Sequence, residues 1–322
     1  MGNHKQRSLM GINNFGFLII DKPKGLTSHD CVNRLRKIYG IKKIGHGGTL
    51  DPAVTGVLPI AIGNATKLLR FLPSSKKYEG TIQLGTKTNT DDLEGRIISK
   101  KRWPKLEIND LDNFLNKFRG SIKQYPPSFS SVNISGERAY KKARRGELFD
   151  LPAKQITFYK IEITNWNQET GQIDLQVNCS AGTYLRSLAR DIGEGLGCGG
   201  SLATLRRIEA LGFNVNQSIS LPELQEKEEI EKPSLINPLN ALDHLPYFRL
   251  RSYQEMVLWC TGQKLIIEGQ RIMNSKNYIK NNKDFSENFV LVLNGQDYLF
   301  GIAKWSSDQS FIQPKIVFNA TS

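Results

Sequence analysis

The sequence predicts an α+β fold with one large domain followed by a small β-rich domain. The 322-residue chain is too long for one comfortable hydrophobic core. Its strand-like and helix-like segments do not alternate regularly, which argues against a doubly wound parallel sheet. Short strand-like runs dominate the last part, residues 245–322. We therefore expect mixed strands and helices with a separate β-rich end.

The first half of the chain contains well-punctuated elements. The run FGFLII ends in the turn DKPKG, and a capping-box pattern at residues 27–30 precedes apolar residues at helical spacing up to Gly40. Helical spacing also marks residues 111–118, closed by Gly120. The remaining predicted elements are a glycine-rich loop at 45–52, strands at 57–63 and 78–85, and a short helix at 64–72.

The second half predicts the domain division. Residues 121–155 lack a strong hydrophobic period and carry a basic cluster, and a segment this long inside a domain is usually functional or mobile. Strands at 155–163 and 173–179, a helix at 183–195 and a charged, proline-containing linker after Leu221 follow. We expect a flexible tail at 1–14, a main domain at 15–240 with an insertion at about 121–155, and a β-rich domain at 245–322.

The charge balance favours a polyanionic partner. The chain has 44 Lys and Arg against 31 Asp and Glu, a formal net charge of +13. KKARR at 141–145 and LRR at 205–207 are local basic clusters, which suits phosphate neutralisation better than an even coat of charge. A solvated basic surface with no nucleic-acid partner is the alternative.

Other compositional features narrow the class of protein. The four cysteines form no CxxC pair, which argues against a zinc knuckle and a disulfide framework. No apolar run approaches the ~20 residues of a membrane span, so we expect no membrane association. The first 14 residues lack the apolar core of a secretory signal, so a cytoplasmic location is expected.

Three segments combine reactive side chains with turn-forming residues. In GHGGTLDP, glycines allow close approach of a ligand, and Pro52 pushes Asp51 toward an extended conformation that can present its carboxylate. Tyr78 in KKYEG could stack on a base or transfer a proton, and Arg186 at a helix start could pair with a carboxylate or phosphate. Taken singly, each has an ordinary structural explanation: a turn, strand packing or a surface arginine. The loop histidine His46, taken alone, likewise has an ordinary structural explanation.

Six segments of the chain form an ordered set of motifs: DKPKGLTSHDCVNRLR, GHGGTLDPAVTGVLPIAIGNATK, KKYEGTIQLGTKTNTDDLEG, PPSFSSVNISGERAYKKARRGE, CSAGTYLRSLARDIGEGLG and LRRIEALGF. In this order they resemble the successive motifs of the bacterial tRNA pseudouridine-55 synthases. The resemblance covers roughly residues 16–220, and a weaker similarity extends to GQKL and PKIVF near the C-terminal end. One departure is Asn133, which stands where the family commonly has a lysine.

The resemblance implies a fold and an activity. The fold would be a mixed, mainly antiparallel sheet flanked by helices, followed by a small PUA-like RNA-binding domain. The activity would be isomerisation of the T-loop uridine at position 55 of tRNA, by C1′–N1 cleavage and C1′–C5 re-ligation after the base is flipped out. Atoms are only rearranged within the substrate, so no cofactor or metal is expected. The expected partner is the tRNA T-arm, bound by a monomer with no obligate protein partner.

The resemblance also assigns residues. Asp51 matches the essential aspartate, which acts either as a nucleophile on carbon or as a base on the ribose. Tyr78 matches the tyrosine that stacks on the target base and is a candidate for removing the C5 proton, and Arg186 matches the arginine that pairs with the aspartate. The insertion at 121–155 would close over the RNA and become ordered on binding. Substrate-binding positions are matched by His46, Lys22, Pro23, Tyr184 and Leu205.

Two other functions remain open. A glycosidase also works at an anomeric carbon with paired carboxylates, for which Asp51 with Asp91 and Asp92 are candidates. A protein that binds and remodels tRNA without modifying it is the second. The presence of Asp51, Tyr78 and Arg186 together argues against this non-catalytic alternative.

Overall fold

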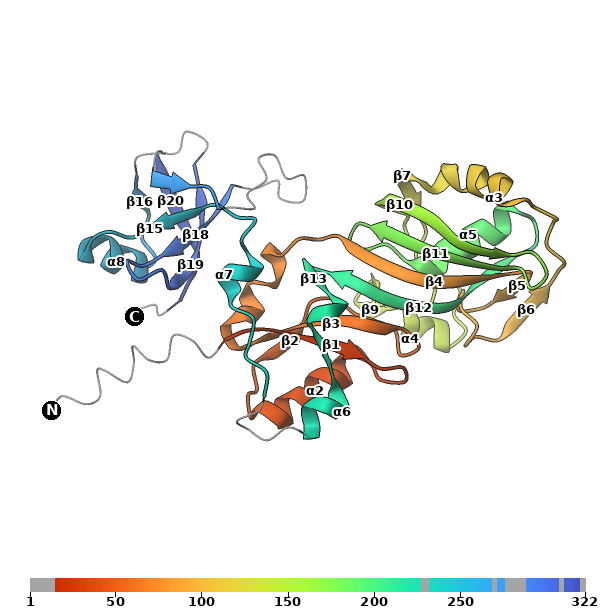
Figure 1. Cartoon of the computed structure of the whole chain (residues 1–322), viewed down its shortest axis with the longest axis horizontal. Helices are drawn as coiled ribbons and strands as arrows, with labels where there is room; N and C mark the ends of the chain where they lie inside the picture. Colours follow the sequence, from red (N-terminus) through yellow and green to blue (C-terminus); the bar gives the residue numbers. More distant parts are fainter. Residues whose placement is uncertain (1–14, 227–231, 268–270, 276–287, 307–309, 319–322) are drawn as a thin grey trace.

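The computed structural model describes residues 15–226, 232–267, 271–275, 288–306 and 310–318, so the predicted tail at 1–14 lies outside the described part. Figure 1 shows a large body built around a long, twisted sheet and a smaller β-rich body beside it. This arrangement confirms the predicted α+β class. None of the described helices is long and apolar enough to cross a membrane.

The large sheet is mixed and mainly antiparallel, as predicted. Its strand order is β14-β1-β3-β12-β4-β11-β10-β7, with β2 added beside β3 and β13 beside β12. Among its described pairs, β1 with β14 and β3 with β12 are parallel. The strands are β1 Gly16–Lys22, β2 Ile44–His46, β3 Thr55–Ile62, β4 Lys76–Leu84, β7 Gly120–Gln124, β10 Lys154–Asn167, β11 Gln172–Cys179, β12 Gly200–Ala210, β13 Phe213–Asn214 and β14 Ser218–Ser220.

Three helices pack against this sheet. Helix α2 (Ser28–Tyr39) begins at the predicted capping box, in which the side chains of Thr27 and Asp30 bond each other's backbone N–H, and it ends at Gly40 with φ 64°. Helix α5 (Leu185–Gly195) buries most of its length against the second half of the sheet. Helix α3 (Ile108–Leu115) covers β10 from the same side.

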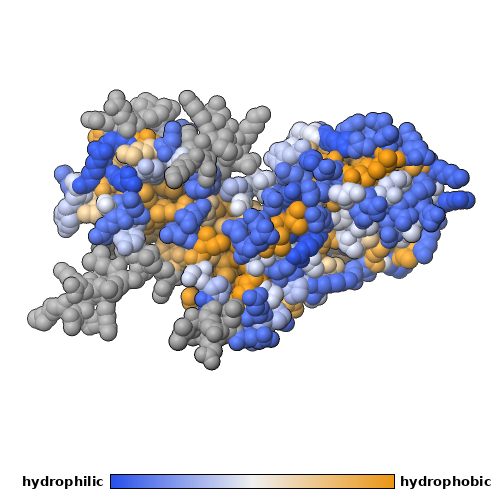
Figure 2. Space-filling view, in the orientation of Figure 1, coloured by the Kyte–Doolittle hydropathy of each residue, from blue (hydrophilic) through white to orange (hydrophobic). Residues whose placement is uncertain are grey.

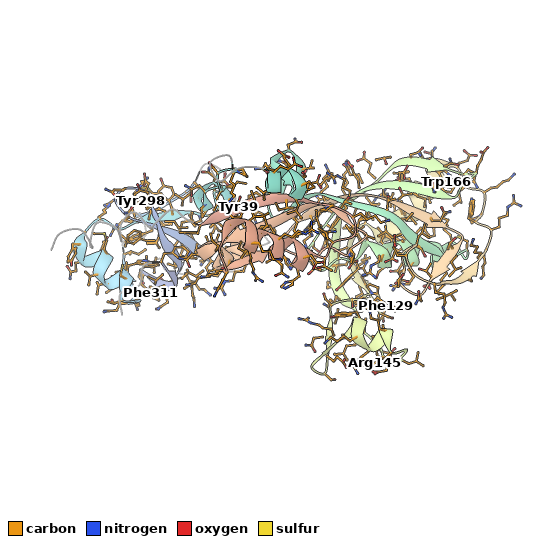
Figure 3. The ribbon with its side chains drawn as sticks, turned by 90° about the horizontal axis from the view of Figure 1, so that it is seen from below. Tyr39, Phe129, Arg145, Trp166, Tyr298 and Phe311 are labelled. Atoms are coloured by element: carbon orange, nitrogen blue, oxygen red, sulfur yellow. The ribbon has the colours of Figure 1, made fainter. Side chains whose placement is uncertain are left out.

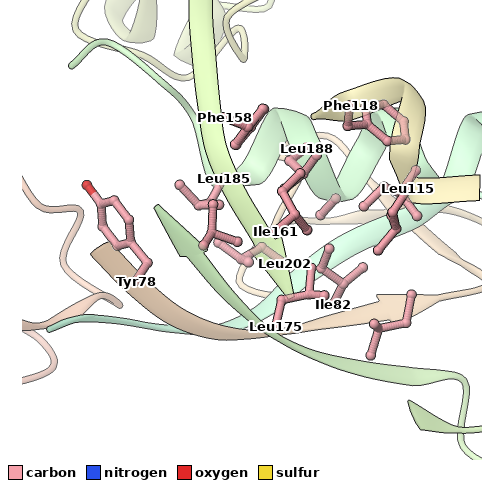
Figure 4. Close-up of a cluster of buried hydrophobic side chains, with 14 of the residues drawn as sticks. Tyr78, Ile82, Leu115, Phe118, Phe158, Ile161, Leu175, Leu185, Leu188 and Leu202 are labelled. Carbon is pink, nitrogen blue, oxygen red and sulfur yellow. The ribbon is translucent and has the colours of Figure 1, made fainter. Parts of the chain in front are cut away.

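The apolar core has separate parts on different regions of the sheet. Helix α2 contributes Val32 and Leu35 to a cluster with the aliphatic residues of β1 and β3. Helices α3 and α5 contribute Leu115 and Leu188 to a larger cluster over β4, β10, β11 and β12 (Figure 4). Burial on this scale contributes about 25 cal/mol per Å² of apolar surface, which fixes α5 firmly on the sheet.

The segment predicted as an irregular insertion contains regular structure. Its start is strand β7, which pairs with β10 and extends the large sheet. Beyond it lie a two-residue hairpin, β8 (Asn133–Ile134) with β9 (Glu137–Arg138), and the short helix α4 (Ala139–Arg144). Seen from below, the part that contains Phe129 and Arg145 projects away from the body (Figure 3). These elements are too short to produce a hydrophobic period in the sequence.

The C-terminal part forms a six-stranded sheet in the order β16-β20-β19-β18-β15-β17. Helix α8 (Tyr253–Cys260) packs on it through Trp259, which is fully buried and donates its indole N–H to Phe300 O at 3.0 Å. On the face shown in Figure 2, hydrophilic colour dominates the large domain and apolar colour is confined to separate patches. The strands are β15 Tyr247–Arg249, β16 Leu265–Ile266, β17 Ile272–Met273, β18 Phe289–Leu293, β19 Leu299–Trp305 and β20 Phe311–Val317.

Two predicted segments differ from the structure. Residues 64–72 form two short 3-10 turns, η2 (Gly63–Lys67) and η3 (Leu69–Phe71), instead of one α-helix. The segment after Leu221 is not a free linker where it is described: helix α6 (Leu221–Glu226) is anchored by buried leucines, and Ile236 pairs with Phe17 beside β1. Because most of this segment is polar and contains prolines, its few buried apolar residues did not produce a pattern that predicts packing. The remaining elements are β5 Thr86–Thr88, β6 Ile97–Lys100, η4 Asn116–Phe118, η5 Val215–Gln217 and α7 Pro238–Ala241.

The close approach of α5 to β12 gives a stability prediction. A methyl group added to Gly193 would lie 2.0 Å from Gly200 N, so Gly193→Ala should force the helix away from the strand. We expect a loss of about 1–3 kcal/mol in the free energy of unfolding, measured by urea denaturation. Gly295→Ala is the matched control, because its methyl group would meet no atom within 4 Å. Equal stability of the two variants would contradict this close packing of helix on strand.

Candidate active site

The loop that carries Asp51 joins β2 to β3 and is fixed from two sides. On one side, the hydroxyl of Ser28, at the start of α2, accepts the N–H of Leu50 at 2.8 Å. On the other side, the buried ammonium of Lys22 donates to the carbonyls of Pro23, Leu26 and Pro52 at 2.8, 2.7 and 3.3 Å. The backbone on both sides of Asp51 is therefore held in place before any substrate binds.

Arg186 connects this loop to helix α5. Its Nη2 lies 2.9 Å from Asp51 Oδ2 and also donates to Phe129 O at 2.9 Å. Its Nη1 donates to Thr90 O at 3.0 Å and lies 3.8 Å from Asp92 Oδ2. Only 8% of the Arg186 side chain is exposed, against 45% of the Asp51 side chain. The Asp51 carboxylate is thus bound on one side by the buried Arg186 guanidinium and is accessible to solvent on the other.

In front of Asp51 is a cavity of about 610 Å³, within the range of sites that take drug-sized ligands. Arg186 and Leu205 line it together with Asp51. Leu205 also lines a smaller apolar recess, which is bounded by Tyr78 and the leucines of α5. The two spaces share Gly80, where a side chain would collide with Thr204 O at 2.7 Å. The carboxylate therefore borders a large open cavity, with a small apolar recess next to it.

Tyr78 lies at the end of the large apolar cluster, with its hydroxyl directed away from the aliphatic side chains (Figure 4). Burial raises the pKa of its phenol, and the charge of Arg207 opposes that rise. Asp51, Tyr78, Arg186 and Leu205 therefore meet around the connected cavity and recess, although they come from four separate segments.

The other predicted binding residues surround this centre without lining the cavity. Burial, followed by the charges of Arg207 and His29, lowers the pKa of His46, whose Nδ1 accepts the N–H of Gly48 at 3.3 Å. Tyr184 precedes α5, and its backbone exchanges two hydrogen bonds with the Gln124 side chain, at 2.9 and 3.1 Å.

Lys22 and Pro23 also lie behind the loop. Lys22 is fully buried, and its ammonium is occupied by three carbonyl groups, one of which belongs to Pro23. Burial lowers the pKa of this amine, while Cys31 and Asp51 favour its charge. Lys22 therefore supports the backbone of the loop and does not line the cavity.

The LRR cluster is not the exposed basic patch that the sequence predicted. Arg206 forms a bidentate ion pair with Asp21, at 2.9 and 2.7 Å, and Arg207 is fully buried. Both belong to β12, a central strand that the sequence analysis did not assign. Arg207 was therefore missed as a site residue, and Asp92, which lines the cavity, was a candidate only for the glycosidase alternative.

The described residues contain no cluster of three or more His, Cys, Asp or Glu side chains that could hold a metal ion. Asp91 and Asp92 are each engaged by a cation. Arg190 Nη1 lies 3.0 Å from Asp91 Oδ2, and Arg186 lies near Asp92. Desolvation raises the pKa of Asp91, while Arg190 opposes the rise.

Comparisons with known proteins define the class. The fold matches a chain in the solved structure of an H/ACA RNP bound to a substrate RNA containing 2′-deoxyuridine, with a TM-score of 0.69 at 24% identity, covering 98% of this chain and 88% of that one. The sequence matches the TruB family pseudouridylate synthase N-terminal domain over residues 36–185, and the tRNA pseudouridylate synthase B C-terminal domain over residues 186–245. The fold is therefore that of the pseudouridine synthases, and the matched family models assign the chain to this class of isomerase.

Full-length relatives identify the family. A tRNA pseudouridine synthase B of Prochlorococcus marinus is 59% identical over 305 residues, covering 95% of this chain and 97% of the relative. One of Synechococcus sp. (strain CC9311) is 47% identical over 308 residues, covering 95% and 98%. The chain belongs to the TruB family of pseudouridylate synthases. Membership decides against the glycosidase and the non-catalytic RNA-binding protein.

The support given by Lys22 leads to a prediction. Lys22→Met keeps the length of the side chain but leaves buried carbonyls without a donor, at a cost of about 1–3 kcal/mol in the free energy of unfolding. The loop at Asp51 should also lose its fixed position, which lowers the single-turnover rate. Lys43→Met is the control, since Lys43 makes one exposed bond, to Asn64. A stable and fully active Lys22→Met would show that the loop needs no such support.

Proposed function

We propose that this enzyme converts the T-loop uridine at position 55 of tRNA to pseudouridine, with Asp51 as the catalytic carboxylate. The observation that carries the proposal is the Asp51–Arg186 pair at 2.9 Å, with the open side of the carboxylate facing a cavity large enough for a nucleoside. The similarity of this chain to tRNA pseudouridine synthases over almost its whole length supports tRNA as the substrate.

The reaction rearranges one nucleoside. The C1′–N1 bond breaks, the uracil turns, and C5 bonds to C1′. Asp51 serves either by attacking carbon or by taking a proton from the ribose, and Arg186 holds the carboxylate in position for either step. Tyr78 and Leu205 both line the apolar recess, and we assign contact with the uracil ring to both and removal of the C5 proton to Tyr78. His46, Pro23 and Tyr184 shape the surroundings in which the flipped nucleotide is held.

The target uridine must leave the T-loop stack to reach Asp51, at a cost of a few kcal/mol. We assign the grip on the RNA to the projecting insertion at 121–155 and to a PUA-like domain at 245–322, which follows the catalytic domain at 15–240. The recognised features are the shape of the T-arm and its splayed bases. The enzyme acts as a cytoplasmic monomer on the tRNA T-arm and needs no cofactor for an internal rearrangement.

The central test uses unmodified tRNA and chemical mapping of pseudouridine at single-nucleotide resolution. The wild-type enzyme should modify one T-loop position, while Asp51→Ala should form no product and still bind the tRNA, because phosphate contacts lie elsewhere. Asp91→Asn is the comparison, since Asp91 faces Arg190 and not the cavity. Product formed by Asp51→Ala, or none formed by the wild type, would refute the proposal.

A second experiment addresses the insertion. Within residues 125–150 few main-chain groups belong to a sheet, so their amide hydrogens should exchange quickly in the free enzyme. Binding of a T-arm stem-loop should slow exchange there, whereas strands β10 and β11 should be protected in both states. Exchange across 125–150 that is unchanged by RNA would contradict its role in gripping the substrate.

A further inference from the structure

Arg207 lies in the interior of the catalytic domain, directly opposite Tyr78. The two residues are paired in the register of β12 and β4, so their side chains leave the sheet on the same face. Arg207 is 0% exposed and is among the largest fully buried side chains. A guanidinium is rarely buried so completely, because its charge loses the solvation of water.

Two backbone carbonyls hold the guanidinium in place. Nε donates to Val57 O on β3 at 2.7 Å, and Nη2 donates to Gly48 O, three residues before Asp51, at 3.2 Å. The remaining nitrogen, Nη1, is buried and has no acceptor at hydrogen-bond distance. Arg207 thus joins β12 to β3 and to the loop that carries Asp51, and its Nη1 is left without an acceptor.

The charges around Arg207 make its burial unusual. Lys22 on β1, His46 on β2 and Lys76 on β4 are close enough for its charge to lower their pKa values. Within the described residues no aspartate or glutamate favours its charged form, and Tyr78 is the group that does. Burying a cation among other cations costs several kcal/mol unless an anion compensates it. The phenol oxygen of Tyr78 is the place where such an anion could form.

We propose that Arg207 is a positioning residue that stabilises negative charge on the Tyr78 oxygen during removal of the C5 proton. The inference rests on the proposed function and adds to it the source of basicity for Tyr78. The cross-strand pairing, the two fixing carbonyls and the unused donor of Arg207 carry it.

The proton step conserves atoms and charge. After C5 has bonded to C1′, C5 carries both its hydrogen and the new bond, and N1 is doubly bonded to C6. The Tyr78 phenolate takes the C5 hydrogen as a proton, and the C5–H electron pair becomes the C5=C6 bond. The N1=C6 π pair moves to N1, which takes from water a proton equal to the one that Tyr78 had released. Arg207 remains protonated throughout.

The other groups that face Tyr78 do not supply this charge compensation. Cys179 on β11 and Asp51 on the loop both raise the pKa of its phenol, as burial does. Burial, Cys179, Asp51 and Arg207 all act on the pKa of the phenol. Of these, only Arg207 carries a positive charge, and it lowers that pKa. Replacing it with an uncharged side chain therefore moves the phenol further from ionisation at neutral pH.

The test compares Arg207→Met and Arg207→Lys with the wild type in single-turnover assays on a T-arm RNA, from pH 6 to 9.5. We expect Arg207→Met to lower the rate at pH 7 at least about tenfold, within the range of a lost proton-transfer contribution, and Arg207→Lys to lower it less. The rate of Arg207→Met should recover as pH rises, and C5-deuterated uridine should slow it at least as much as it slows the wild type. RNA affinity should be unchanged.

Arg119→Met is the matched control for losing an arginine that donates to a backbone carbonyl, because Arg119 Nη2 donates to Ile161 O at 2.9 Å and Arg119 does not line the cavity. If Arg207→Met does not fold, 3-fluorotyrosine at position 78, followed by ¹⁹F NMR, should titrate at lower pH beside Arg207 than in Arg207→Lys. A loss of rate that is equal at all pH values with no isotope effect, or a fluorotyrosine titration unchanged by Arg207→Lys, would overturn the inference. An inactive wild type would instead refute the proposed function.

Discussion

The burial of the Arg186 guanidinium constrains the whole candidate active site. A buried cation that loses its partners costs several kcal/mol, so its donors must be satisfied together. The acceptors are Asp51, the carbonyl of Thr90 and the carbonyl of Phe129, from three segments far apart in the sequence. One side chain on α5 therefore fixes the catalytic loop, the turn after β5 and the base of the insertion relative to one another. The geometry of the site and the packing of the domain have the same physical origin.

Helix α5 extends this connection to the projecting segment. Ser187 and Arg190 both donate to Tyr125 O, at 2.9 Å, just after strand β7 ends. The base of the insertion is thus attached to the helix that also holds Asp51 through Arg186. Because Arg186 Nη2 contacts both Asp51 and Phe129 O, a displacement of the insertion at this point changes the hydrogen bonding of the catalytic pair. The position of the insertion and the alignment of the Asp51 carboxylate are therefore mechanically linked.

The sequence predicted those features that have local causes. The capping box of α2 and the alternation in β10 and β11 are local features. The family motifs predicted the pairing of Asp51 with Arg186, which lie 2.9 Å apart in the structure. Strand β12 was not predicted, because two consecutive arginines looked like a surface patch. Arg207 faces the interior and Arg206 pairs with Asp21, and both facts depend on neighbours more than 100 positions away. Neither periodicity nor composition reports such neighbours.

The same observation changes how the net charge of +13 is interpreted. Arg186 and Arg207 are buried and Arg206 is paired with Asp21, so these three arginines add to the total without being unpaired surface cations. In the insertion, Arg145 forms ion pairs with Glu137 and Glu147 at 2.7 Å, so that part of the KKARR cluster is also compensated. Exposed cations outside these pairs must therefore make the phosphate contacts. Net charge indicates the class of partner, whereas the pairing of each cation determines where the partner is held.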